Sequence, residues 1–292
     1  MRTLPAHPGP VEKAVLASLS PTFAARRVET PFGSLRVLEG GAGPALILLH
    51  GRGSAATTWF QMLPGLARSH RVLAVDLPGF GQSQARSFRG GGFEAGLAFF
   101  TDAIEHWIVA ESLQKEAIAG HSLGGLVAIE LARRGHVAPS KLVLIGGMGL
   151  GSAMTHGSRV FFRLGPERLA RRLGRAAFER LDAPPSTPDG PQLGALGFEL
   201  YSVRRGRPNA SAAFDAMCPL FGPVPHRADS LAHISAPTLV LWGDGDEVFP
   251  SPVAIAAAAA LPNATLRIEP FGHSPHLEAP EHVASILEEF LR

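Results

Sequence analysis

A Gly-x-Ser-x-Gly motif at residues 120–124 constrains this chain more than any other stretch. Residues 116–119 before it are typical of a short buried strand, and residues 126–134 after it have the composition and length of a helix. Such a turn holds Ser122 in a strained backbone conformation with its hydroxyl exposed. Glycine is expected at both ends of the motif because a Cβ there would collide with a neighbouring strand or helix. The alternative is a glycine-rich turn with an incidental serine.

The rest of the chain alternates strand-like and helix-like segments. Residues 45–49 are continuously apolar, as expected of a strand that is covered on both faces. Alternation at this spacing predicts an α/β fold with a mostly parallel central sheet flanked by helices. The predicted strands are 26–30, 35–39, 45–49, 71–75, 116–119, 141–145, 238–242 and 265–268, and the predicted helices are 57–68, 93–111, 126–134, 252–260 and 280–291.

The alternation stops between residues 150 and 233, where the sequence shows no convincing strand. Residues 158–182 and 194–205 have helical composition. An insertion between two strands, on the side of the sheet where strands end, is positioned to cover a site there. The predicted organisation is an N-terminal extension (1–22) with a short, surface-packed helix at 11–20, an α/β core (23–149 and 234–292), and a helical cap (150–233) inserted between strands 6 and 7.

Composition excludes several classes of protein. The chain is 46% hydrophobic and 18% charged, which is typical of a globular protein. A net charge of +2, without Lys and Arg runs that carry aromatic residues, gives no indication of nucleic-acid binding. The longest apolar stretch, 253–261, is too short to span a bilayer, so no stable membrane insertion is expected. Early prolines interrupt any signal-peptide core, and a single Cys218, expected to be a buried thiol, excludes an internal disulfide, so we expect a cytoplasmic protein.

Five motifs in fixed order resemble the α/β-hydrolase family, specifically its serine hydrolases with a helical cap. The resemblance runs from about residue 26 to the end, interrupted by the cap, and implies the α/β-hydrolase fold. The motifs are His-Gly-x-Gly at 50–53, Asp-Leu-Pro-Gly-Phe-Gly-Gln-Ser at 76–83, Gly-His-Ser-Leu-Gly-Gly at 120–125, Trp-Gly-Asp-Gly-Asp at 242–246 and Gly-His-Ser-Pro-His-Leu-Glu-Ala-Pro at 272–280.

The resemblance implies a catalytic triad of Ser122, Asp246 and His273, in the family's order of serine, acid and histidine. The chemistry needs these residue types independently, because a serine hydroxyl requires an adjacent base and the base requires an orienting carboxylate. Asp244 follows the same strand, but the family spacing Trp-Gly-x-x-Asp selects Asp246. His276 is the rival base and is expected to pack beside the site instead.

By the same resemblance, two backbone N–H groups form the oxyanion hole, those of Arg52 and Leu123. Each such donor contributes roughly 3–4 kcal/mol to stabilisation of the transition state. The sequence leaves open whether the Arg52 side chain points into the pocket or lies on the surface. His50 and His121 are expected to support these loops, and Asp76 is expected to hold its own turn.

The predicted function is hydrolysis of a small-molecule carboxylic ester through an acyl-serine intermediate. Carbon–carbon bond hydrolases, lactonases, thioesterases and acyltransferases use the same triad, and the motifs do not separate them. A serine nucleophile argues against the haloalkane dehalogenase and epoxide hydrolase branches, where a carboxylate attacks. The alternative from another class is a ligand-binding protein of the same fold without turnover. The twelve histidines do not pair with carboxylates at ligand spacing, so no metal or cofactor is expected, and the sequence does not set the oligomeric state.

The predicted cap is expected to set substrate choice. Its arginines outnumber its acidic residues, which indicates either a solvated face or attraction of an acidic substrate, with Arg171 and Arg172 as the test positions. Its large apolar residues either line a pocket or form helix cores. These residues are Phe161, Phe162, Phe178, Phe198, Phe214, Met217 and Phe221.

Overall fold

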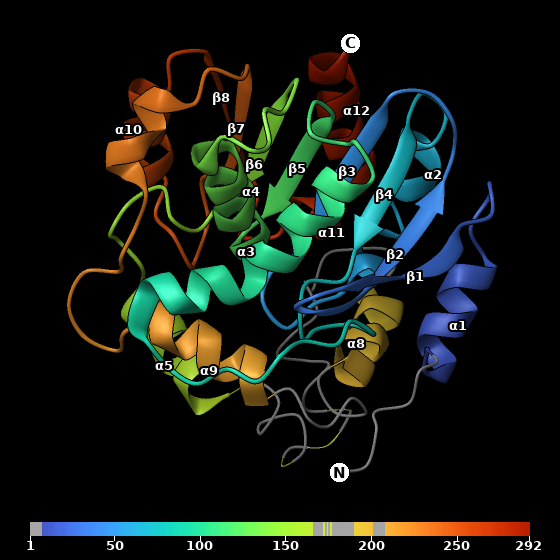
Figure 1. Cartoon of the computed structure of the whole chain (residues 1–292), viewed down its shortest axis with the longest axis horizontal. Coiled ribbons are helices and arrows are strands. Elements are labelled where there is room, and N and C mark those ends of the chain that lie inside the picture. The colour runs from blue at the N-terminus through green and yellow to red at the C-terminus, as the bar shows by residue number, and fades with distance from the viewer. Residues whose placement is uncertain (1–7, 166–171, 173, 175, 177–189, 201–207) are drawn as a thin grey trace.

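The computed structural model describes residues 8–165, 172, 174, 176, 190–200 and 208–292. These residues form one sheet of eight strands in the order β1-β2-β4-β3-β5-β6-β7-β8 (Figure 1). β2 is antiparallel to β1 and β4, and every other neighbouring pair is parallel, as predicted. The strands are β1 (Ala24–Thr30), β2 (Gly33–Gly40), β3 (Ala45–Leu49), β4 (Arg71–Val75), β5 (Ala117–His121), β6 (Leu142–Ile145), β7 (Thr238–Gly243) and β8 (Ala264–Glu269).

The central strands are buried on both faces because their side chains alternate between two hydrophobic cores. In β3, Ile47 and Leu49 belong to one core, and Leu46 and Leu48 belong to the other. The first core is covered by α3 (Gly92–Ala110), α4 (Leu123–Arg134) and α10 (Pro252–Ala260). The second is covered by α2 (Leu63–Leu66) and α12 (Pro280–Leu291).

The parallel register brings the ends of the central strands to one edge of the sheet. Leu49 at the end of β3 pairs with both Val75 of β4 and Gly120 of β5. Ile145 at the end of β6 pairs with His121 and with Leu241 of β7. The loops that follow β3, β4, β5, β6 and β7 therefore meet at this edge.

The chain between β6 and β7, residues 150–233, is called the insertion below. Its described residues form helices and no strand: α5 (His156–Leu164), α8 (Gly190–Phe198), α9 (Pro208–Met217) and the 3-10 helix η3 (Ala228–His233). Figure 1 shows α5, α8 and α9 below the sheet, on the side to which the arrows of β4 and β5 point. The domain boundaries given above stay a prediction.

Two helix predictions are wrong in extent. The predicted helix 57–68 is a 3-10 turn, η1 (Ala56–Trp59), followed by the short α2. Pro64 explains the break, because it has no N–H to continue a helix from the preceding turn.

The predicted helix 158–182 corresponds to α5 only as far as Leu164. At Gly165 the chain takes a positive φ of 78°, which ends the helix. The rest of this prediction falls mostly outside the described residues, as do residues 201–205 of the predicted helix 194–205. Helix α9 was not predicted.

The N-terminal helix α1 (Pro10–Ala17) is shorter than the predicted 11–20, and it packs on the surface as expected, with one buried face and one exposed face. Val15 and Glu12 are fully buried. Arg36 donates to the Glu12 carboxylate over 2.7 Å. At the start of α1, the backbone N–H groups of Val11 and Glu12 donate to the carboxylate of Glu199, which follows α8, over 2.9 and 3.1 Å. α1 therefore joins the insertion to the core.

None of the helices in the described part of the chain combines the length and apolarity that a membrane crossing requires.

Candidate active site

Ser122 lies at the predicted turn between β5 and α4, with φ 51° and ψ −114°. This left-handed φ is rare for a residue with a side chain, so the surrounding structure must hold the turn. A Cβ at Gly120 would strike the Gly124 carbonyl, and a Cβ at Gly124 would strike the Leu49 carbonyl of β3. Both glycines are therefore needed to bring the serine to the edge of the sheet, at the N-terminus of a twelve-residue helix.

A cavity of about 730 Å³ opens beside this serine and is lined by core loops and by the insertion. Ser122 and His273 both line it. The insertion contributes Thr155, Gly157, Ser158, Phe161, Phe162, Leu193, Leu196, Gly197 and Leu200. The cavity therefore has a polar side, made by core loops, and a largely apolar side.

His273 is hydrogen-bonded to Asp246, with 2.9 Å between Nδ1 and Oδ2. The Asp246 side chain is fully buried, and its Oδ1 accepts the backbone N–H groups of Val248 and Phe249 over 2.7 and 2.9 Å. These three bonds fix the carboxylate and orient the ring so that Nε2 is the nitrogen left for chemistry. Asp244 is exposed, and the structure places Asp246 rather than Asp244 against the histidine.

Ser122 and His273 line the same cavity, but no hydrogen bond joins these two described side chains. Such bonds are often long before substrate binds. The loop that carries His273 is held on two sides. His121 Nε2 donates to the His273 carbonyl over 2.9 Å, and the Glu278 carboxylate accepts the N–H groups of Gly272 and Ser274 over 2.6 and 3.1 Å.

Sequence reasoning missed the role of Glu278. Its position five residues after His273 in the same motif is the signal that a carboxylate could reach back to the loop.

The rival histidine, His276, is buried at 2% exposure against Trp59 and His121, with ring centroids 4.5 and 4.4 Å apart. Burial, with a smaller contribution from the nearby His273, lowers the pKa of His276 to about 3. A group with this pKa is a poor proton acceptor near neutral pH. The structure agrees with the expectation that His276 packs beside the site.

The two backbone groups predicted for an oxyanion hole belong to loops at this edge. Leu123 opens α4, so its N–H is among the first-turn groups that have no acceptor within the helix. Arg52 follows β3, in a turn held by His50, whose Nε2 accepts the Leu77 N–H over 2.9 Å. Asp76 holds its own turn, as predicted, by accepting the Gln82 N–H over 2.5 Å.

The structure decides the orientation of the Arg52 side chain, which the sequence left open. It lines the cavity and is only 7% exposed. Its guanidinium carbon lies 5.3 Å from the ring centroid of Phe162 in α5 and 5.1 Å from that of Phe214 in α9. The side chain therefore points from the core into the insertion.

The predicted apolar residues of the insertion divide into different environments. Phe161 and Phe162 line the cavity, Phe214 and Met217 are buried in the core, and Phe221 is exposed. Phe178 and Arg171 lie outside the described residues, and Arg172 is exposed.

The cavity-lining residues Leu193, Leu196 and Leu200 were missed. Their i, i+3, i+7 spacing, which marks one face of a helix, was the available signal.

Cys218 is buried, as predicted, with its Sγ atom 3.4 Å from Sδ of Met154. Burial raises the pKa of the Cys218 thiol, so this residue is not an activated nucleophile.

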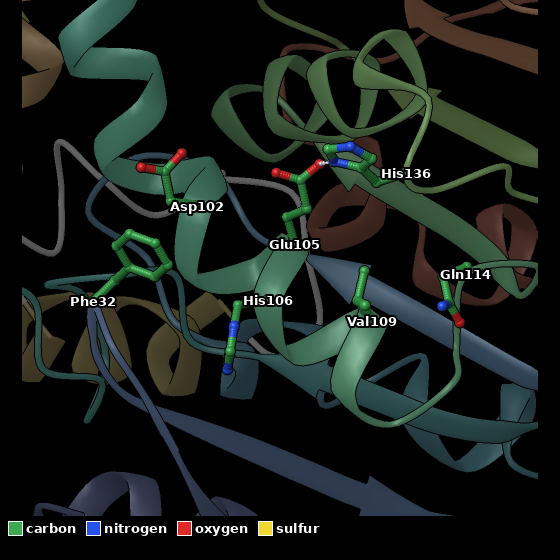
Figure 2. Close-up of a pocket in the computed structure, with 7 residues that line it drawn as sticks. All are labelled: Phe32, Asp102, Glu105, His106, Val109, Gln114 and His136. Carbon is green, nitrogen blue, oxygen red and sulfur yellow. Dashed lines mark hydrogen bonds and ion pairs between the residues drawn. The ribbon is translucent and has the colours of Figure 1, made fainter.

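A second cavity, of about 580 Å³, lies along α3 and is lined by side chains that Figure 2 shows as sticks. Its two carboxylates are already engaged: Arg134 donates to Asp102 and Glu105 over 2.9 and 2.8 Å, and His136 lies 3.0 Å from Glu105. None of the predicted site residues lines this cavity, so the first cavity remains the candidate site.

Comparison with known proteins identifies the family. The model of the α/β hydrolase fold matches residues 44–280, and the chain belongs to this family of hydrolases.

Among curated proteins, it is 32% identical to the pimeloyl-(acyl-carrier protein) methyl ester esterase of Aromatoleum aromaticum, over 85% of this chain and 98% of that protein. It is 29% identical to the 2-hydroxymuconate semialdehyde hydrolase of a Pseudomonas species, over 87% and 88% of the two chains. The crystal structure of carboxylesterase CesB from Bacillus subtilis superposes with a TM-score of 0.79, covering 96% of this chain and 95% of that one at 20% identity, which shows the shared fold.

Proposed function

We propose that this protein is a serine hydrolase that cleaves a small-molecule carboxylic ester through an acyl-serine intermediate. The observation that most supports this proposal is the arrangement of Ser122, His273 and Asp246. Ser122 stands at a strained turn before α4, in the same cavity as His273, whose Nδ1 is bonded to the buried Asp246. A nucleophile, a base and an orienting carboxylate are the three parts that acyl transfer to serine requires.

In the proposed reaction, Ser122 Oγ attacks the ester carbonyl carbon while His273 Nε2 takes the hydroxyl proton. The N–H groups of Leu123 and Arg52 stabilise the negative charge that forms on the carbonyl oxygen. Collapse of the tetrahedral intermediate breaks the bond to the alcohol, which leaves with the proton from His273. A water molecule, activated by the same ring, then attacks the acyl-serine and releases the acid.

The esterase of Aromatoleum supports an ester substrate by similarity. A second candidate is hydrolysis of a carbon–carbon bond, which the similarity to 2-hydroxymuconate semialdehyde hydrolase favours. The same serine and histidine would act in both reactions, so the choice depends on the substrate that the cavity accepts.

Turnover of p-nitrophenyl acetate and butyrate, measured beside a lactone, a thioester and 2-hydroxymuconate semialdehyde, tests both candidates. Ser122→Ala should lower ester turnover at least about a thousandfold, because the remaining groups act only as a unit with the serine. Ser158→Ala is the matched control, since Ser158 lines the same cavity from α5.

A fluorophosphonate probe should label the wild-type protein at Ser122. Labelling at another residue, or ester turnover that survives Ser122→Ala, would contradict the assignment. If the probe labels no residue and no substrate is turned over, the result would indicate the ligand-binding alternative.

A further inference from the structure

We propose that Glu199 and the N-terminal helix α1 determine which esters the protein prefers, because together they fix α8 as an apolar wall for the acyl group. This inference rests on the proposed function and narrows its substrate class to esters whose acyl group is long enough to contact α8. Glu199 is not among the residues that line the cavity, so it acts as a positioning residue, through the helix that it holds.

The first observation is that α8 contacts both the cavity and α1. Leu193 and Leu196 of α8, and Leu200 just after it, line the cavity. The same three leucines belong to the hydrophobic core that contains Val15 of α1. Figure 1 shows α8 next to α1, and the two helices are in contact. A shift of α8 relative to α1 would therefore change the apolar side of the cavity.

The second observation is how α8 is held to α1. Glu199 directly follows α8 and is only 3% exposed, and its carboxylate accepts the N–H groups of Val11 and Glu12 over 2.9 and 3.1 Å. Pro10 begins α1 and has no N–H, so these two groups are the first in the helix that need an acceptor. A buried carboxylate is costly unless it is hydrogen-bonded, and the positive end of a helix is a favourable partner. Both oxygens of Glu199 are therefore used to join the two helices.

Gly9 makes room for this contact. It precedes α1 with φ −67° and ψ 174°, a backbone conformation that does not require glycine. A Cβ on Gly9 would instead collide with the carboxylate of Glu199. Gly9 also provides no side chain to cap α1, and Glu199 supplies the acceptor that an N-cap residue usually gives.

The third observation is how α1 is fixed to the core. The Glu12 carboxylate is fully buried and accepts hydrogen bonds from Arg36 of β2 and Thr57 of η1 over 2.7 and 2.5 Å. Arg36 also donates to Asp76 over 3.2 Å. Thr58, the residue after Thr57, lines the cavity. α1 therefore connects α8 to the core loops and sets the position of the apolar wall relative to them.

A wall that is already in place favours an acyl group that contacts it. Binding of a long acyl chain then gains apolar contact without the additional cost of ordering α8. If α8 were released from α1, ordering it would cost part of the binding free energy. An acetyl group has the least apolar surface to place against α8, so its turnover should depend least on Glu199.

The test compares kcat/KM for p-nitrophenyl hexanoate with kcat/KM for p-nitrophenyl acetate. Glu199→Ala should lower the ratio of the hexanoate value to the acetate value at least about fivefold, because the variant must order α8 on binding. Glu199→Gln keeps the size but replaces one acceptor oxygen by a donor, so its ratio should be intermediate. Glu289→Ala is the matched control, because it removes an exposed carboxylate of α12, and its ratio should stay within about twofold of the wild type.

Gly9→Ala tests the same contact from the side of α1. This variant leaves Glu199 and the net charge unchanged, but its Cβ displaces the carboxylate. It should lower the ratio of the two kcat/KM values at least about threefold. A lower ratio in Glu199→Ala without one in Gly9→Ala would show that α1 does not set the position of α8, and would overturn the proposal.

A purely structural role of Glu199 gives a different result. Loss of folded protein lowers both kcat/KM values by the same factor, so the ratio would stay within about twofold of the wild type, which would overturn the proposal. Hydrogen exchange of residues 193–200 should be faster in Glu199→Ala than in the wild type, while exchange in α4 should not change. Equal exchange of residues 193–200 in the two proteins would also overturn it.

Binding keeps the test independent of turnover. In Ser122→Ala protein, calorimetry should show that addition of Glu199→Ala weakens binding of p-nitrophenyl hexanoate at least about threefold. Failure of the proposed hydrolysis would appear as absent turnover and labelling in the wild type. Failure of this inference would appear as a ratio of kcat/KM values and a hexanoate affinity that Glu199→Ala leaves unchanged.

Discussion

The core loops and the insertion both line the cavity, but they contribute different groups. The core loops hold polar groups by hydrogen bonds: Asp246 accepts two backbone N–H groups, and Glu278 accepts two from the loop that carries His273. The insertion contributes mainly apolar surface, with Phe162, Leu193 and Leu196 among its lining residues. Separate parts of the molecule therefore orient the polar groups and supply most of the apolar surface of the cavity.

This separation has a physical basis. Hydrogen bonds are directional, so a base or carboxylate needs partners within a rigid frame, and the ends of parallel strands supply one. Apolar contact is non-directional and tolerates change in shape. Changes in the loops should therefore alter the rate of the proposed reaction, and changes in the insertion should alter which substrate reacts.

The largest expected effect tests the loop side of the comparison. His273→Ala should lower ester turnover at least about a thousandfold, since loss of one member removes the action of the whole group. His276→Gln changes a histidine in the adjacent short helix α11 (Pro275–Glu278), whose pKa is already too low for a base, and its effect should be far smaller. Steady-state kinetics of both variants on one p-nitrophenyl ester shows which of the two histidines is the base. A greater loss of turnover in the His276 variant than in the His273 variant would show that the assignment of His273 as the base is wrong.

The second prediction concerns how much stability two buried histidines beside the cavity, His121 and His276, cost the protein. His276 stays neutral in the folded chain down to a pKa of about 3, and burial also lowers the pKa of His121 well below its ordinary value. Between about pH 6.5 and pH 3 the unfolded chain binds protons that the folded chain does not, so stability should fall as pH falls.

Denaturant unfolding across this range checks the sign. Each of these two histidines lowers the free energy of unfolding by up to about 1.4 kcal/mol for each pH unit of acidification. His276→Gln should therefore make the free energy of unfolding depend less on pH. The exposed His233, changed to Gln, is the control. A stability that is constant or rises toward low pH, after allowance for the control, would contradict the burial argument.

The third prediction tests the insertion side. Leu196→Trp should fill the cavity from α8 and lower kcat/KM for long-chain p-nitrophenyl esters about tenfold relative to the acetate, because a pocket discriminates size by its free volume. Leu164→Trp is the control, since Leu164 is 57% exposed on α5 and does not line the cavity. An equal loss with every ester would show that the insertion also sets the rate.

The smallest effect concerns how the insertion is held. Glu199→Ala removes the acceptor for two N–H groups at the start of α1 and should lower the free energy of unfolding by about 1–2 kcal/mol, as loss of a helix cap does. Glu289→Ala, at an exposed pair with Arg267, should change it by less than about 0.5 kcal/mol. Equal values for the two variants, measured by urea unfolding, would show that α1 does not anchor the insertion.

Local sequence determined much of the frame. The continuously apolar residues 45–49 became a strand buried on both faces, and the helices 252–260 and 280–291 begin and end at the predicted residues. The serine turn was predictable because Gly120 and Gly124 lie where the Cβ of any other residue would collide with a backbone carbonyl. The choice of Asp246 over Asp244 followed from motif spacing, and the structure places that carboxylate against His273. The catalytic roles of these residues stay predictions.

The surroundings of each side chain depend on the three-dimensional fold and could not be predicted from local sequence. Arg52 points into the cavity because Phe162 and Phe214, both more than a hundred positions later in the chain, place their rings beside it. Glu199 caps a helix that begins at Pro10, and nothing near either residue indicates the other. Backbone conformation depends on neighbours in sequence, whereas burial, ion pairing and pKa depend on partners that folding brings together from far along the chain.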